Sequence, residues 1–60
     1  MCEITKELFY KIVSSEEKAD EVINRELFTD IIYKIEGVTI KQRVNHASGV
    51  IQHFIIDINY

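Results

Sequence analysis

His46 and Ser48 are the two residues of this sequence whose spacing most suggests catalysis. A histidine two positions from a serine could serve as its base, because a catalytic base must lie within hydrogen-bond reach of its nucleophile. Both residues fall in one short stretch of turn-forming residues, where side chains so close in sequence rarely align. No oxyanion-hole motif accompanies them. We therefore interpret His46 as a solvated turn residue, expect no catalytic residues and predict that the protein is not an enzyme.

Potential ligands for metals and phosphates are present, but they lack the spacing of known sites. Gly37 and Gly49 are isolated, so no glycine-rich loop could hold a phosphate. The side chains that could bind zinc follow no recognised pattern along the chain. We expect neither a metal nor a cofactor. The zinc ligands considered are Cys2, His46, His53 and Asp57.

The chain has 60 residues, 47% of them hydrophobic and 28% charged, with a net charge of −3. This size predicts one domain, residues 1–60, which buries only roughly 60% of its unfolded surface. Domains this small usually need disulfides, a metal or a partner chain, and the single cysteine, Cys2, excludes a disulfide within the chain. We therefore expect a homo-oligomer. The lone cysteine and the lack of a visible signal peptide or membrane span predict a cytoplasmic protein.

A helix is predicted over about residues 15–26. Ser14 and Glu17 have the spacing of a capping box, and further acidic residues follow where the helix dipole favours negative charge. Hydrophobic residues then recur at intervals of three and four, which is typical of an amphipathic helix. These are Ala19, Val22, Ile23 and Leu27.

The stretch IIYKIEGVTIKQRV, residues 31–44, fits either a β-hairpin about Glu36-Gly37 or a helix that ends before Gly37. The helical ridge of i+4 steps would drift around the axis by roughly 40° per step and leave no consistent polar face. The hairpin has one largely apolar face, and it pairs Asp30 with Arg43 on the other. We therefore predict strands over about 28–35 and 38–44, with the helix as the alternative.

A third strand is predicted over about 50–59, after the turn-forming stretch NHASG at 45–49. We expect Val44 to pair with Val50. That register sets Ile40 opposite Phe54 and continues the apolar face of the first hairpin. The expected core, covered by the helix, comprises Val22, Ile23, Leu27, Tyr33, Ile35, Val38, Ile40, Phe54, Ile56 and Ile58.

Residues 4–13 fit an extra strand or a short helix. The run LFYKIV leads directly into Ser14, as strands that enter helices do, and we prefer the strand. Spacings of four between Ile4, Leu8 and Ile12, with a favourable Glu7–Lys11 pair, keep the helix open. Either choice predicts an α+β fold in which one main helix packs on a small antiparallel sheet. The alternative is two helices followed by a C-terminal β-hairpin.

The sheet face that points away from the predicted helix is the best candidate for a binding surface. It would combine three isoleucines with basic side chains, and apolar patches on small proteins tend to mark interaction surfaces. We expect this face to bind a second copy or another protein. The predicted interface residues are Ile32, Lys34, Lys41, Arg43, Ile51, His53 and Ile55.

The sequence thus predicts a small non-enzymatic interaction or regulatory protein that acts as a homo-oligomer through a sheet face. One alternative is a small-ligand module formed between subunits. It would use Tyr33, Lys41, Arg43 and His53. Another is weak nucleic-acid contact through Lys34, Lys41 and Arg43, with His46 nearby. The acidic net charge argues against this, because nucleic-acid binding depends on neutralising phosphates.

Overall fold

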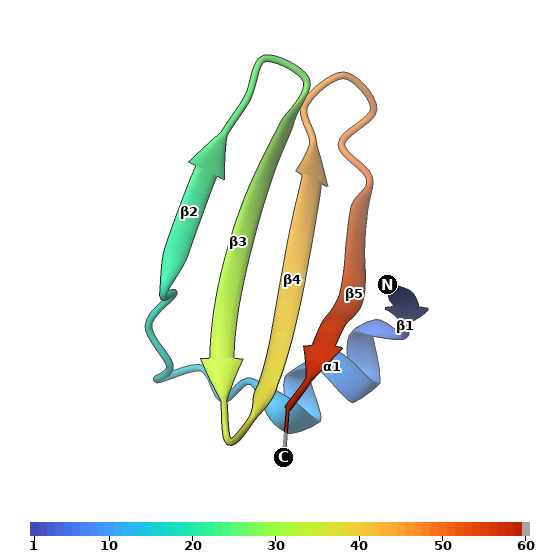
Figure 1. Cartoon of the computed structure of the whole chain (residues 1–60). Coiled ribbons are helices and arrows are strands. Elements are labelled where there is room, and N and C mark those ends of the chain that lie inside the picture. The colour runs from blue at the N-terminus through green and yellow to red at the C-terminus, as the bar shows by residue number, and fades with distance from the viewer. Residues whose placement is uncertain (60) are drawn as a thin grey trace.

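The described part of the chain, residues 1–59, forms five strands and one helix in this computed structural model. All strand pairs are antiparallel, and the spatial order is β1-β5-β4-β3-β2. The fold is therefore α+β with a dominant sheet (Figure 1). In chain order the elements are β1 (Cys2–Ile4), α1 (Lys6–Ile12), β2 (Glu21–Asn24), β3 (Phe28–Ile35), β4 (Val38–Asn45) and β5 (Ile51–Ile58).

Helix α1 lies against one face of the sheet, which we call the helix face. Thr5 caps the helix, because its Oγ1 accepts a hydrogen bond of 3.1 Å from the Leu8 N–H. Phe9 and Val13 are buried against Ile40 of β4 and form the core. In Figure 1, α1 lies behind the lower part of the strands, and no helix lies behind their upper part. No helix within residues 1–59 is long and apolar enough to cross a membrane.

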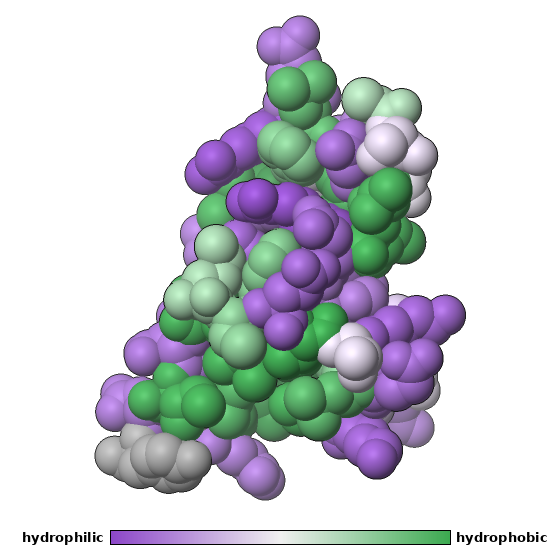
Figure 2. Space-filling model, turned by 90° about the vertical axis from the view of Figure 1, so that its right-hand side faces the viewer, coloured by the Kyte–Doolittle hydropathy of each residue, from purple (hydrophilic) through white to green (hydrophobic). Residues whose placement is uncertain are grey.

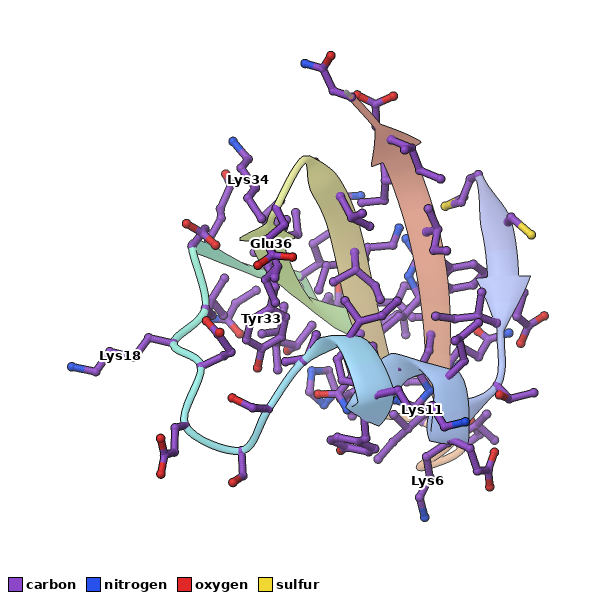
Figure 3. The ribbon with its side chains drawn as sticks, turned by 90° about the horizontal axis from the view of Figure 1, so that it is seen from below. Lys6, Lys11, Lys18, Tyr33, Lys34 and Glu36 are labelled. Atoms are coloured by element: carbon purple, nitrogen blue, oxygen red, sulfur yellow. The ribbon has the colours of Figure 1, made fainter. Side chains whose placement is uncertain are left out.

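The side of the sheet opposite α1 is called the open face, and in Figure 3, which views the molecule from below, it lies on the side of the strands away from the helix. Lys6 and Lys11 point away from the strands on the helix side, and Lys34 points to the side opposite α1 (Figure 3). Within the described residues no helix or strand covers this open face. The sheet is therefore a single layer with a two-turn helix over part of one face.

The predicted helix over 15–26 is wrong: residues 14–20 are irregular and Glu21–Asn24 form strand β2. Like charges four residues apart weaken a helix here, as at Glu17 and Glu21. Ser14 only closes a turn, in which its carbonyl accepts from the Glu17 N–H at 3.1 Å. The helix lies earlier, within the 4–13 segment, for which we preferred a strand. Only its first residue belongs to β1, and the helical alternative is confirmed at Lys6–Ile12.

The hairpin prediction for residues 28–44 is confirmed, including its register. Ile35 pairs with Val38, and Asp30 pairs with Arg43. Glu36 and Gly37 both have positive φ, 49° and 81°, as a two-residue type I′ turn requires. The cost of placing glutamate in this conformation does not prevent the turn, because the apolar faces of the two strands match only in this register.

The third strand is present as β5, but its predicted register is wrong by one residue. Val44 pairs with Ile51 rather than Val50, and Lys41 pairs with Phe54. The connection lies one residue later than expected, at 46–50, because Asn45 still belongs to β4 and its N–H donates to the Val50 carbonyl at 2.9 Å. A shift of one residue moves every side chain of a strand to the other face.

This shift, together with β2, changes the membership of the core. Tyr33, Ile35, Val38 and Ile40 are in the core or packed against it, as predicted. The predicted core residues Ile23 and Phe54 lie on the open face instead, opposite Asp30 and Lys41 respectively. A register irregularity at Thr39/Ile40 leaves one extra residue in β5. The remaining predicted core residues are exposed: Val22, Leu27, Ile56 and Ile58.

The outer edge of β3 extends past the end of β2. Asp20 covers this extension: its N–H donates to the Ile32 carbonyl at 2.8 Å, and its carboxylate accepts from the Lys34 N–H at 2.7 Å. The side chain therefore occupies the backbone donor at which a neighbouring strand would otherwise continue.

Candidate functional site

The predicted interface residues do not share one face. Four of them, Ile32, Lys34, Lys41 and Arg43, lie on the open face as expected. The other three lie on the helix face, because the register of β5 differs from the predicted one. Of these three, Ile51 is half-exposed, His53 is buried and Ile55 packs against the core. The structure thus separates one predicted surface into two.

An ion pair crosses the centre of the open face. Arg43 donates to both carboxylate oxygens of Asp30, from Nε at 2.9 Å and from Nη2 at 3.3 Å. This bidentate geometry is the strong form of the arginine–carboxylate contact. The Arg43 hydrogen bonds hold the pKa of Asp30 below its usual value, against the effect of burial. Asp30 is 4% exposed although no helix or strand of the described chain lies over it.

Two phenylalanines complete this arrangement. The Arg43 guanidinium lies 4.9 Å from the ring centre of Phe28 and 6.0 Å from that of Phe54. The Lys41 ammonium lies 5.2 Å from the Phe54 ring centre, and Lys41 is 7% exposed. Each distance is within the range of cation–π attraction. The side chains of the open face therefore cover one another.

On the helix face, His53 lies under α1. Its ring centre is 4.4 Å from that of Phe9, and the residue is buried. The Gln42 amide nitrogen lies 3.1 Å from His53 Nε2 and 3.3 Å from the Tyr10 hydroxyl. Burial lowers the pKa of His53, and Lys6 lowers it further while Glu7 raises it. A neutral ring whose Nε2 accepts from Gln42 fits this site.

Above the part of the helix face that α1 covers lies a surface of short aliphatic side chains. We call Val22, Ile31, Val44 and Ile51 the shelf. The register places Val22 beside Ile31 and Val44 beside Ile51, one pair on each half of the sheet. Val22 and Ile51 are each 52% exposed. Figure 2 shows hydrophobic side chains at the surface on the helix side, above the hydrophilic outer side of α1.

Residues with catalytic potential have structural partners instead. His46 Nε2 lies 2.7 Å from the Thr29 hydroxyl, and Ser48 Oγ accepts from the Val50 N–H at 3.2 Å. No pocket is found in the described chain, and residues 1–59 hold no cluster of three or more metal-binding side chains. The proposed ligand residues are divided too: Tyr33 and His53 lie on the helix face, Lys41 and Arg43 on the open face.

Sequence reasoning missed Val22 as a surface residue and Phe28 and Phe54 as members of the open face. The helix prediction assigned Val22 to the core. The β-branched pair Val22-Ile23, followed by residues 24–26, could have indicated the end of a strand instead. Phe54 was placed on the wrong face by one residue of register. Phe28 follows from the confirmed β3 register, which puts it on the same face as Asp30.

Comparisons with known protein families, with characterised proteins and with solved structures find no match to this chain.

Proposed function

We propose that this chain is a small non-enzymatic interaction or regulatory protein that works as a homo-oligomer through a face of its sheet. The observation that carries the proposal is the balance of its apolar side chains. Within residues 1–59, three hydrophobic residues are buried and nine large ones are exposed. A chain that leaves three times as many large apolar side chains exposed as it buries completely gains stability by covering them with a partner.

The total surface supports the same proposal. The chain exposes 4445 Å², whereas a typical folded monomer of 7.0 kDa exposes about 4,000 Å². The excess follows from a sheet that, within the part of the chain that the structure describes, has one short helix on one side and no layer on the other. We place its action in the cytoplasm, because the exposed free thiol of Cys2 fits a reducing compartment.

The test is the mass of the protein in solution. Sedimentation velocity and light scattering from micromolar to near-millimolar concentration should give a mass above 7.0 kDa that rises with concentration. A constant mass of one chain over the whole range would contradict the proposal.

A second candidate, contact with single-stranded nucleic acid, is favoured by one observation. Lys34, Lys41 and Arg43 share the open face with Phe28 and Phe54, and basic side chains beside aromatic rings suit phosphates and stacked bases. Asp30 already neutralises Arg43, and the chain is acidic, so we rank this candidate second. Fluorescence anisotropy with a labelled oligonucleotide, compared between the wild type and Lys41→Ala, tests it. Binding that the substitution weakens would support it, and no binding at low salt would exclude it.

A further inference from the structure

The shelf consists of two apolar pairs, each of which borders polar side chains in its own row across the sheet. Thr29 borders Val44 in one row, and it contacts Asn24 at 3.1 Å and His46 at 2.7 Å. Gln42 borders Ile31 in the other row, and it contacts Tyr10 and His53. These polar groups are satisfied within the chain and need no partner, whereas Val22 and Ile51 at the two ends of the shelf remain exposed.

The shelf and its borders carry no acidic side chain and no lysine or arginine, although 28% of the chain is charged. This matters for a contact between two copies, each of net charge −3. In a two-fold symmetric contact the same patch faces itself, so charged residues near its centre oppose their own copies. The strand residues of this region are Val22, Asn24, Thr29, Ile31, Gln42, Val44, Ile51 and His53.

The open face, unlike the shelf, carries charged side chains at its centre. Its centre carries Lys41 and Arg43 side by side on β4, and a second copy would bring the same cations against them. Asp30 compensates only one of the two charges. Like charges brought together in a partly dry contact are costly, so the shelf suits a second copy better than the open face does.

The shape of the shelf also fits a second sheet. Four strands at about 4.8 Å spacing, over about four residues at 3.3 Å, give a flat footprint of roughly 250 Å². A stable interface covers about 800 Å² on each partner. The contact must therefore extend onto Tyr10 of α1 and Leu27 beside the β2–β3 turn, both more than half exposed. Two sheets that pack face to face, about 10 Å apart, would make such a contact.

We propose that the shelf is where a second copy of this chain binds, sheet against sheet about a two-fold axis. The inference rests on the proposed self-association and names its surface. The two shelves then form one shared apolar core next to the two copies of α1.

A pair of matched variants tests this surface. Ile51→Asp places a charge in the shelf, and Ile58→Asp places the same charge at the far end of the same strand. The two isoleucines are similarly exposed, at 52% and 47%, so the intrinsic costs of the two substitutions are similar. Sedimentation should show that Ile51→Asp raises the dimer dissociation constant at least about tenfold, and that Ile58→Asp changes it by less than about twofold.

Circular dichroism establishes that each variant is folded. Where Ile51→Asp does not fold, Val22→Lys on the short edge strand β2 serves in its place, with the same expected dissociation. Amide chemical shifts of the wild type, followed on dilution, give a test without substitutions: changes should centre on the shelf and spare Lys41 and Arg43.

The outcomes separate the inference from the proposed function. A wild-type protein that stays monomeric overturns both. A wild-type oligomer that Ile51→Asp leaves intact, or whose dilution shifts centre on the open face, overturns the shelf assignment and keeps self-association. Selective dissociation by Ile51→Asp, or by Val22→Lys in its place, supports both.

Discussion

The open face and the shelf differ in a way that the positions of the helix and strands do not explain. No helix or strand among residues 1–59 covers either surface, yet Asp30 and Lys41 on the open face are almost completely buried, while Val22 and Ile51 on the shelf are half exposed. The open face is the more polar of the two and the better covered.

Side-chain length accounts for the difference. Arginine, lysine and phenylalanine are long enough to lie along the sheet and cover neighbouring residues, as Arg43 does between Phe28 and Phe54. Valine and isoleucine are short and stiff, and they stand up from the strand without reaching the next residue. A single-layer sheet can therefore protect a face of long mixed side chains by itself, but a face of short aliphatic ones needs another layer.

The largest expected difference between the faces comes from removing one ring from each. Phe9→Ala should lower the free energy of unfolding by about 3–5 kcal/mol, because the ring is the largest side chain of the core. A chain of this size has roughly 3–9 kcal/mol in total, so little of the variant should remain folded. Phe54→Ala on the open face should lower it by only about 1 kcal/mol. Urea denaturation measures both, and equal losses would contradict the distinction.

A smaller effect should follow from breaking the open-face ion pair. Arg43→Ala leaves the Asp30 carboxylate without its partner and should lower the free energy of unfolding by about 2 kcal/mol. The control is the double variant Asp30→Val/Arg43→Met, which removes both charges and keeps apolar cover. Urea denaturation should show that the double variant is the more stable of the two. A double variant less stable than Arg43→Ala would show that the loss of the ion pair, and not the unpaired Asp30 carboxylate, causes most of the fall in the free energy of unfolding.

The smallest expected effect is a pH dependence located on the helix face. Burial lowers the pKa of His53 below its ordinary value of 6.5, so between the two values the unfolded chain holds more protons than the folded chain. The free energy of unfolding should therefore fall as the pH drops below 6.5, and this contribution should be fully present above it. Urea denaturation at pH about 7.5 and about 5.5 measures the change.

The matched variant for this effect is His53→Gln, which keeps a polar side chain beside Gln42 but cannot gain a charge in this pH range. It should lose the part of the pH dependence that His53 contributes. A slope as steep in the variant as in the wild type would mean that other groups cause it.

The sequence predicted the β3–β4 hairpin in full because two signals agreed there. The Glu36-Gly37 turn and the alternation of apolar residues specify the same register, and the Asp30–Arg43 pair then follows. The β4–β5 hairpin had no such agreement, because the stretch around Asn45 permits the turn at two positions one residue apart. Asn45 favours the observed position, since its side chain accepts from the Ala47 and Ser48 N–H groups at 2.9 and 3.1 Å.

The helix was misplaced because local and long-range preferences conflict in residues 14–24. The capping residues at Ser14 favour a helix locally. The edge of β3 offers Val22 and its neighbours backbone hydrogen bonds that a short acidic helix does not match. That competition depends on a strand elsewhere in the chain, so no local pattern shows it. The candidate site was affected in the same way. The pairing of β5 with β4 differs by one residue from the prediction, and this long-range difference moved Ile51 to the helix face.

Asp20 has a consequence for contacts at the edge of the sheet. An exposed strand edge is a template on which further chains can add without limit, and such growth leads to fibres. The Asp20 carboxylate already holds the Lys34 N–H at the end of β3, and it adds a negative charge where an incoming backbone would align. This aspartate therefore disfavours the addition of a further strand at that end of β3.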